Sequence, residues 1–303
     1  MKKIFSSCIL AICCYTFFIS CSKENSNDPN NPSNVETYLT KETIKEMYHG
    51  TLYTDVSMYF YDNLKRLLKV VRESSHSKSS SEVDFIYNTD GTLNKTVSSS
   101  DYIESFFYEN NKIQKVIYSS SDGSDTLYLF YNNDGKIQRT IHNIDHNIFS
   151  GKLFETVDYT LDNNGKVNKR IKSRKNYNGE NNLWEYYIDT TNFKYSSNGN
   201  LTSSIRNKTD MLTNERTWDK YEYEYDSKLN YWFTKHSPKE YLFIESLYPD
   251  RDYSTNNITL TTFTSSSGGF EANIRNITNY NSNGYPIVIT ANWGSIELEY
   301  SEN

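Results

Sequence analysis

The sequence predicts an all-β fold, an antiparallel meander of repeated β-hairpins that forms a long, coiled or rolled sheet. Three observations support this prediction: a turn unit recurs along the chain, the residues beside it alternate between apolar and polar, and long helical periodicity is absent. The chain has 303 residues, of which 15% are aromatic, including 27 Tyr. It is therefore too long for a disulfide-stapled mini-protein and too aromatic for a disordered chain.

The N-terminal segment has the features of an export signal. Two lysines precede an apolar run from Ile4 to Ile19, and the small residue Ser20 follows. The run is shorter than the ~20 residues that a membrane-spanning helix prefers. We therefore expect residues 1–20 to be a lipoprotein signal peptide, with an uncleaved anchor or a plain secretory signal as alternatives.

Cys21 follows this segment. The stretch from Phe18 to Cys21 resembles the lipobox of bacterial lipoproteins, in which a small residue precedes the cysteine that is lipidated, although Phe18 stands where Leu is usual. Cys13 and Cys14 do not follow a small residue, and Cys8 comes too early in the apolar run. The resemblance implies that Cys21 is lipidated and that the protein meets a membrane through this N-terminal lipid. Because no cysteine comes later, we expect no disulfide and no thiolate metal site in the rest of the chain.

Residues 21–35 are expected to form the lipidated cysteine and a disordered tether. The stretch 22–34 contains no apolar side chain except two Pro. Such a flexible chain spans roughly 20 Å, which lets a folded domain stand away from a membrane. The pair Lys23-Glu24 resembles the short surface-export signal of Bacteroidetes lipoproteins. Residues 36–303 then form a single repeat-containing β domain.

A tight turn unit recurs within this domain. Asn, Asp or Ser occupies the first position of the turn, and Gly occupies the fourth position in most units. The side chain at the first position can cap the turn backbone, and Gly adopts a positive φ at little cost, so each unit predicts a hairpin. The units are Tyr61–Leu67, Tyr87–Leu93, Tyr131–Ile137, Leu161–Val167, Tyr195–Leu201 and Tyr280–Pro286, with a shorter unit at Tyr108–Ile113.

These units resemble the tyrosine–aspartate (Rhs-like) repeat family. The chain is more closely similar to a family of Bacteroidetes lipoproteins that carry such repeats and have no assigned function. The resemblance covers roughly residues 50–300. It implies a cell-envelope protein, an outer-membrane lipoprotein that is exposed at the surface, and it supplies no catalytic residues. It includes three later features, at Tyr225–Asn230, Ser254–Asn257 and Tyr280–Tyr300.

In chain order, the domain is expected to begin with one short helix over residues 36–49. About 14–16 strands follow, and the stretch from Tyr221 to Tyr225 shows their alternation most clearly, with Tyr on one face and Glu on the other. The irregular stretch 226–256 is expected to cap one end. So long a sheet must cover its apolar face, so it has to coil, roll or fold over itself, and an open or a closed sheet would satisfy this. Ser-rich connections at the far ends of the hairpins span residues 74–81, 98–101, 119–125 and 265–269.

The turn length also predicts which residues face each other across each hairpin. If Asn88 pairs with Thr92, then Phe85 lies opposite Lys95. Applied to all the hairpins, the same count places five cations in total, each opposite an aromatic residue or Leu, on one sheet face. Such a column either stabilises the sheet through cross-strand pairs or binds an anionic polymer or an acidic partner. The predicted pairs are Tyr59–Lys69, Phe85–Lys95, Phe106–Lys115, Leu129–Arg139 and Tyr159–Lys169.

Two tryptophans are further candidates for ligand contact. Trp184 and Trp218 flank the longer connections, where their rings can stack on sugars or simply pack. No nucleophile elbow, metalloprotease helix or phosphate-binding glycine loop occurs in the sequence. His142 and His146 have a spacing that suits one face of a helix, but the segment around them is expected to be a loop. We therefore expect no metal site, no cofactor and no catalytic residue.

These observations favour a membrane-anchored lipoprotein that acts as a binding or scaffold module at the cell envelope, with a glycan or a protein as its ligand. The alternatives are a structural envelope protein without a small ligand, or a carboxylate-dependent glycoside hydrolase, for which no spacing singles out a pair of acids. A formal charge of −6 argues against a nucleic-acid partner, because nucleic-acid binders carry a basic footprint.

Overall fold

The computed structural model describes residues 37–121, 123–146, 151–178, 183–231, 244 and 254–302. These residues form one antiparallel sheet of 18 strands. Within them, no helix is both long enough and apolar enough to cross a membrane. The strands are β1 (Thr37–Tyr48), β2 (Thr51–Tyr61), β3 (Leu67–Ser74), β4 (Ser79–Tyr87), β5 (Leu93–Ser98), β6 (Ile103–Glu109), β7 (Lys112–Ser120), β8 (Gly123–Tyr131), β9 (Ile137–His146), β10 (Gly151–Leu161), β11 (Val167–Asn178), β12 (Leu183–Tyr195), β13 (Leu201–Asp210), β14 (Arg216–Leu229), β15 (Asn256–Ser265), β16 (Phe270–Tyr280), β17 (Pro286–Ala291) and β18 (Gly294–Glu302).

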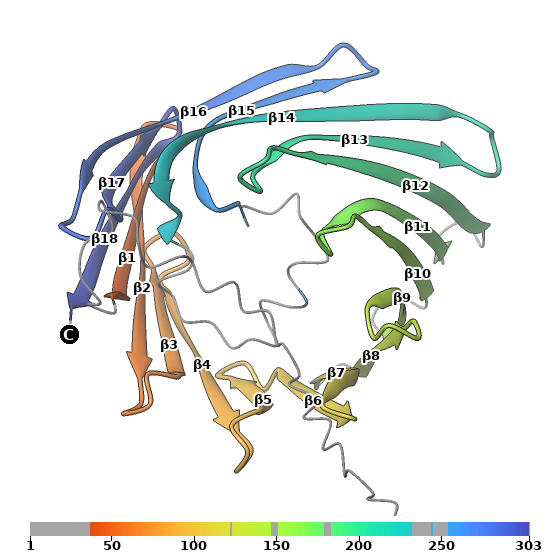
Figure 1. The fold of residues 1–303 in the computed structure, drawn as a ribbon, viewed down its shortest axis with the longest axis horizontal. Helices are drawn as coiled ribbons and strands as arrows, with labels where there is room; N and C mark the ends of the chain where they lie inside the picture. The colour runs from red at the N-terminus through yellow and green to blue at the C-terminus, as the bar shows by residue number, and fades with distance from the viewer. Residues whose placement is uncertain are drawn as a thin grey trace, which may run out of the picture.

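The all-β antiparallel meander is confirmed, and the sheet closes on itself into a barrel. Each strand pairs with the strands before and after it in the chain, and β1 pairs with both β2 and β18 (Figure 1). The sheet is thus a closed barrel rather than a coiled open sheet, and it has more strands than the 14–16 expected. Closure pairs the backbone groups that two free sheet edges would leave exposed.

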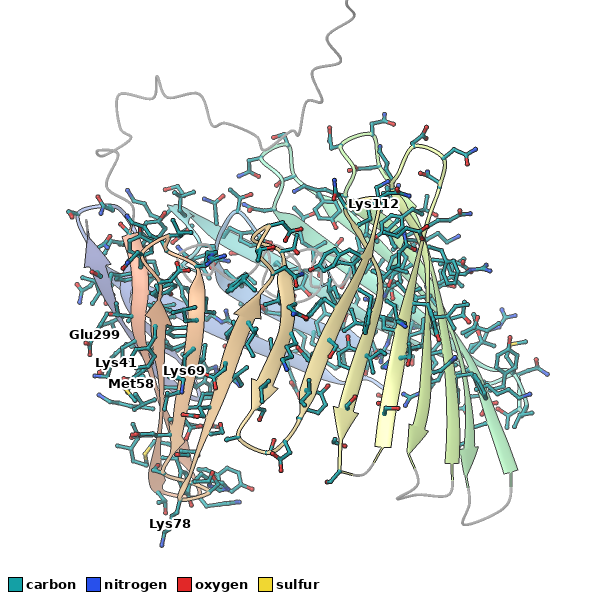
Figure 2. All side chains as sticks on the ribbon, turned by 90° about the horizontal axis from the view of Figure 1, so that it is seen from below. Lys41, Met58, Lys69, Lys78, Lys112 and Glu299 are labelled. Atoms are coloured by element: carbon teal, nitrogen blue, oxygen red, sulfur yellow. The ribbon has the colours of Figure 1, made fainter. Side chains whose placement is uncertain are left out.

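The helix expected over residues 36–49 is wrong, because this segment forms β1. The strand is hydrogen-bonded on both sides, to β18 and to β2. A shift of register between Leu39 and Lys41 turns Leu39 into the interior and leaves Lys41 outside, 2.6 Å from Glu299 (Figure 2). A helix would satisfy only the segment's own backbone groups, whereas the strand also satisfies the two edges of the sheet.

The predicted turns have the expected backbone geometry. Gly91 has a φ of 85°, and its N–H donates to the carbonyl of Asn88 at 3.0 Å. Asn110 and Asn111 have φ values of 50° and 59°, as a two-residue primed turn requires. Side-chain capping is present as well, since Asp62 Oδ1 accepts the N–H of Arg66 at 2.8 Å.

The two ends of the barrel differ in their connections. Lys112, beside an Asx turn, and Lys78, in a Ser-rich connection, lie at opposite ends (Figure 2). We call these the turn end and the far end. The described chain enters at the turn end, where the amide of Asn283 in the β16–β17 turn donates to the hydroxyl of Thr37 at 2.8 Å.

The interior is apolar near the turn end. The aliphatic residue that follows each turn points inward, as does the residue three positions later, and both are buried. The larger cluster consists of Leu93, Phe106, Ile113, Val116, Leu127, Leu129, Ile137, Val157, Tyr159, Val167, Phe193 and Leu201. A smaller cluster lies beside the junction of β1 and β18, which we call the seam. It consists of Leu39, Tyr231, Ile289, Ile296 and Leu298.

The first tyrosine of the repeat unit links successive hairpins. Its hydroxyl donates to the backbone carbonyl of the first residue after the preceding turn, as Tyr131 does to Ile113 at 2.8 Å. Burial raises the pKa of the Tyr131 phenol to about 12. The unit at Leu161 has no phenol and cannot make this bond to Ile137. Seven such hydrogen bonds among the described residues have lengths of 2.6–2.9 Å. They join Tyr61 to Leu39, Tyr87 to Leu67, Tyr108 to Leu93, Tyr131 to Ile113, Tyr195 to Val167, Tyr225 to Leu201 and Tyr300 to Pro286.

The stretch 226–256 was expected to cap one end, and the structure describes only part of it. Its first residues extend β14 to Leu229, and Asn256 begins β15. Between these strands, Tyr231 packs in the seam cluster and Ile244 packs against the larger cluster. These two side chains therefore contribute to the apolar interior, and the rest of the expected cap lies outside the described residues.

Candidate functional site

The five predicted cations occupy equivalent places on the outer face of alternate strands. Each is followed by a residue that is buried in the interior, so each cation must point outward. Each also lies two residues beyond the inward aliphatic residue that follows its turn. The cations therefore form a row along the outer wall. They are Lys69, Lys95, Lys115, Arg139 and Lys169, on β3, β5, β7, β9 and β11.

The predicted partners of these cations are wrong by one residue. Tyr87 does lie opposite Leu93, but Lys95 lies opposite Ile86 and not Phe85. The register shifts between Ile86 and Tyr87, where a β-bulge sets two residues of one strand against one of the other. The predicted aromatic partners therefore point inward. The observed pairs are Phe60–Lys69, Ile86–Lys95, Phe107–Lys115, Phe130–Arg139 and Thr160–Lys169.

Two cations of the row are ion-paired on the outer wall. Lys69 Nζ lies 3.2 Å from carboxylate oxygens of both Asp84 and Glu82, and these hydrogen bonds raise the pKa of Lys69. Arg139 Nε lies 2.5 Å from Asp158 Oδ1, and this contact raises the pKa of Arg139. Exposed pairs of this kind contribute little to stability, because water and salt screen them.

The other three cations lack such a partner among the described carboxylates. Lys115 Nζ lies 4.3 Å from the centroid of the Phe107 ring, a cation–π contact. Lys95 is flanked by Ile86 and Ser105 on the neighbouring strands. Lys169 is likewise flanked by uncharged residues. Whether any of the five cations contacts a ligand stays a prediction.

A second set of cation–aromatic contacts lies at the turn end, and sequence reasoning missed it. Lys112 Nζ lies 5.2 Å from the Tyr131 ring centroid, and Lys166 Nζ lies 5.0 Å from that of Tyr195. Burial lowers the pKa of Lys166. The signal was present in the repeat, because Lys or Arg often precedes the aliphatic residue that ends the unit. These cations cover the phenols that link the hairpins, so their role is structural.

The two predicted tryptophans do not come together in a described site. Trp218 lies on the outer face of β14, opposite Asn207, and 42% of it is exposed. Trp184 lies in β12, and its side chain is outside the described part of the chain. Trp218 therefore remains available for stacking on the outer wall.

The inner face toward the far end carries a polar patch that the sequence did not reveal. We call Glu155, Lys172, Arg174, Tyr187, Asp189 and Lys208 the inner polar patch. Their inward direction follows from the alternation with buried neighbours, since Glu155 lies two residues before Val157 in β10 and Asp189 lies two residues before Thr191 in β12. Arg174 is exposed, so solvent reaches this part of the inner face.

Opposite charges alternate across this patch. Lys172 Nζ lies 2.7 Å from Glu155 Oε2, and Asp189 lies in register between Lys172 and Lys208. One carboxylate oxygen of Asp189, Oδ1, is buried without a hydrogen-bond partner among the described residues. Lys208 Nζ also lies 4.0 Å from the centroid of the Tyr187 ring. The patch thus combines an aromatic ring with charged hydrogen-bonding groups.

The later sequence features come together where β14 ends and β15 begins. Asp226 accepts hydrogen bonds from the Asn257 amide at 3.1 Å and from the Tyr280 hydroxyl at 2.6 Å. Burial and the Asp226 carboxylate raise the pKa of the Tyr280 phenol. The Asn230 amide donates to the Ser254 carbonyl at 3.1 Å. These residues hold together the two ends of the stretch between β14 and β15, which is a structural role.

No group of three or more potential metal ligands occurs among the described residues. His142 belongs to β9, so the expectation of a loop at this position is wrong. Its ring lies 5.7 Å from that of Tyr118 on the inner face. The side chain of His146 is outside the described part of the chain.

Comparisons with known proteins give remote similarity only. No family model matches the chain, and no curated protein matches it. A porin-like protein from Bacteroides uniformis is 11% identical, with 88% of this chain and 98% of that chain covered, at a TM-score of 0.42. Two structures of TcdB2-TccC3, one with Cdc42 and one with TEV in the name, are 9% and 12% identical. They cover 82% and 89% of this chain but only 15% and 16% of theirs, at TM-scores of 0.29 and 0.25. At these TM-scores the similarities do not establish a shared fold.

Proposed function

We propose that this protein is a lipoprotein of the cell envelope, held on the outer membrane through Cys21, and that its barrel is a binding module for a glycan. The inner polar patch is the proposed binding site. The barrel is the folded part of the module, and the preceding residues are its tether.

The observation that carries this proposal is the division of the inner face between the two ends. At the turn end the interior is filled by buried apolar side chains, whereas toward the far end it carries the inner polar patch. The described chain starts at Thr37, at the turn end. A lipid on Cys21 would therefore keep the turn end near the membrane and direct the polar far end away from it.

The chemistry of the patch suits a sugar. Aromatic rings present an apolar face to sugar rings, and charged side chains hydrogen-bond to hydroxyl and carboxylate groups. Tyr187 supplies the ring, with Lys208 against it and Arg174 in register on the next strand. Two further rings of the inner face, Tyr102 and Tyr118, stack at 6.4 Å between centroids.

Glycan-array and calorimetric binding with the detergent-solubilised full-length protein test this proposal. Tyr187→Ala should lower the affinity for the bound glycan by about tenfold, because the stacking surface is removed. Trp218→Ala, which removes an exposed ring from the outer wall, should leave that affinity unchanged. Loss of binding in Trp218→Ala with retention in Tyr187→Ala would reject the inner polar patch as the site.

The anchor is tested separately. Cys21→Ser should move the protein from the membrane fraction to the soluble fraction, because the acyl chains supply the membrane affinity. No glycan binding, together with an envelope defect on deletion, would favour the structural alternative. Turnover of a polysaccharide that is abolished by Glu155→Gln would favour a hydrolase.

A further inference from the structure

Away from the turns, the described charged side chains on strands β5–β9 are sorted across the barrel wall. The described cations Lys95, Lys115 and Arg139 point outward, whereas Glu104 and Asp125 point inward. Glu104 lies in register with buried Thr96 on the neighbouring strand, and Asp125 lies two residues before buried Leu127. A protein with an overall formal charge of −6 therefore presents a basic outer surface on these strands.

Few carboxylates offset this surface. Among the described side chains on the outer face of β5–β11, we find Asp158, which pairs with Arg139, and Glu109, which lies opposite Lys112 beside a turn. Lys95, Lys115 and Lys169 form no ion pair with a described carboxylate.

The outer wall beyond β5–β11 is different. There several cations lie against carboxylates, as Lys41 on β1 does against Glu299 and Lys69 on β3, close to β5, does against Asp84. Lys45 pairs with Glu297 in the same way. Since both walls belong to the same repeat, the lack of partners on β5–β11 does not follow from the fold itself.

Exposed aromatic rings lie beside Lys115 and Arg139 on this surface. Lys115 lies in register between Phe107 and Tyr128, and Phe130 lies opposite Arg139. The exposed fractions of Phe107, Tyr128 and Phe130 are 42%, 39% and 45%. Large aromatic side chains are usually buried because burial removes their apolar area from water, so three exposed rings beside cations point to a binding surface.

We propose that this surface, the basic outer face, binds a chain of an acidic polysaccharide. The face is defined by Lys95, Lys115, Arg139 and Lys169 with the rings of Phe107, Tyr128 and Phe130. Carboxylates of the polymer meet the lysines, and its sugar rings stack on the exposed aromatic rings. This inference goes beyond the proposed function and depends neither on lipidation of Cys21 nor on the inner polar patch.

The spacing of the cations favours a polysaccharide over a nucleic acid. They lie on every second strand at the same distance from their turns, so neighbouring cations are roughly 10 Å apart around the barrel. Double-stranded DNA presents a charge about every 1.7 Å along its axis, far more than this row can neutralise. A polysaccharide with at most one acid group on each sugar ring carries far fewer charges per unit length than DNA, so it suits a sparse row of cations separated by aromatic rings.

The position of the face argues against the protein's own membrane as its partner. The face is centred near β8, across the barrel from β1, where the described chain begins (Figure 1). It also lies on the convex side of the wall, which a flat bilayer would meet along only a few strands.

Co-sedimentation and biolayer measurements with the detergent-solubilised full-length protein test the proposal. The probes are a galacturonic acid polymer, a neutral dextran and vesicles of phosphatidylglycerol. The wild-type protein should bind the galacturonic acid polymer, more weakly as salt is added, and should not bind dextran. The triple variant Lys95→Gln/Lys115→Gln/Lys169→Gln should lower this affinity by about tenfold, since three exposed charge contacts are lost.

The matched control is Lys41→Gln/Lys45→Gln/Lys220→Gln, which removes the same charge from ion-paired positions on the other wall. It should leave the affinity for the polymer within about twofold. Tyr187→Ala should also retain polymer binding. A failure of the glycan site proposed at the inner polar patch can therefore be told apart from a failure of the basic outer face. Equal loss in both triple variants would overturn the proposal, as would vesicle binding that depends on the three lysines when polymer binding does not.

Discussion

At the residue scale, one recurring position in the repeat unit explains part of the high tyrosine content of this chain. The tyrosine that opens most units fills the inner wall beside the preceding hairpin and donates its hydroxyl to a backbone carbonyl there, as Tyr195 does to Val167 at 2.9 Å. A cation at the turn then covers the ring, as Lys166 covers Tyr195. The cation needs only the aromatic ring, whereas the hydrogen bond needs the phenol, so phenylalanine would fill the space and keep the cation contact but lose the bond.

Leu161 opens a unit without a phenol, whereas Tyr280 donates its hydroxyl to the Asp226 carboxylate instead of a backbone carbonyl, so Leu161 gives a direct test of the backbone bond. Leu161→Tyr should raise the free energy of unfolding by about 1 kcal/mol, because a new phenol can donate to the carbonyl of Ile137. Tyr131→Phe, which removes an existing bond to Ile113, should lower it by a similar amount. Urea unfolding followed by circular dichroism measures both changes, and a destabilised Leu161→Tyr would show that this place cannot accept the bond.

The same phenols predict a loss of stability at high pH. Burial raises the pKa of Tyr131 to about 12, whereas a tyrosine in the unfolded chain ionises near pH 10. The stabilisation from the neutral phenol is therefore complete below about pH 10 and is lost as the pH rises from 10 toward 12. Burial raises the pKa of Tyr61 in the same direction.

Unfolding measured at intervals of pH, together with tyrosinate absorbance, checks this prediction. Tyr131→Phe should be less stable than the wild type near neutral pH and should lose less stability between pH 10 and 12. A free energy of unfolding that stays constant over this range in the wild type would contradict the conclusion that these phenols are buried and neutral in the folded protein.

At the scale of the element, the hairpins could be predicted from sequence because their signals are local. Asn88 and Gly91 lie within one turn, and their preferences for capping and for positive φ do not depend on distant residues. The bulge after the turn was missed because it leaves Tyr87 opposite Leu93, as counted, and changes only the pairs beyond. This single extra residue moved every predicted aromatic partner to the other face.

The first strand could not be predicted for a different reason. Residues 37–48 pair with β18, which lies more than 240 residues later in the chain. Local propensity favours a helix here, whereas the hydrogen bonds to β18 and β2 form only once the whole sheet is present. The inner polar patch was missed for the same reason, since Glu155, Lys172 and Lys208 come together only through strand pairing.

At the scale of the whole molecule, the seam between β1 and β18 decides whether the sheet is a barrel or an open repeat. Gly294 begins β18 at this seam, where a Cβ atom would lie 1.8 Å from the carbonyl oxygen of Lys45 on β1. The two strands could not approach as they do with any other residue at this position. Gly165, in the β10–β11 turn, has open space where a Cβ atom would lie. Its φ of 81° is therefore the feature that favours glycine there.

The two glycines should therefore respond differently to substitution. Gly165→Ala should cost about 1 kcal/mol, the strain of a left-handed backbone with a Cβ atom. Gly294→Ala should cost more, because β1 and β18 must separate locally and expose two sheet edges. Hydrogen exchange locates the effect: protection should fall at β1 and β18 in Gly294→Ala and only near the turn in Gly165→Ala. If the barrel is one cooperative unit, the seam variant should also lower protection at β9 and β10, halfway round the sheet, whereas an open array of hairpins would confine the loss to the seam.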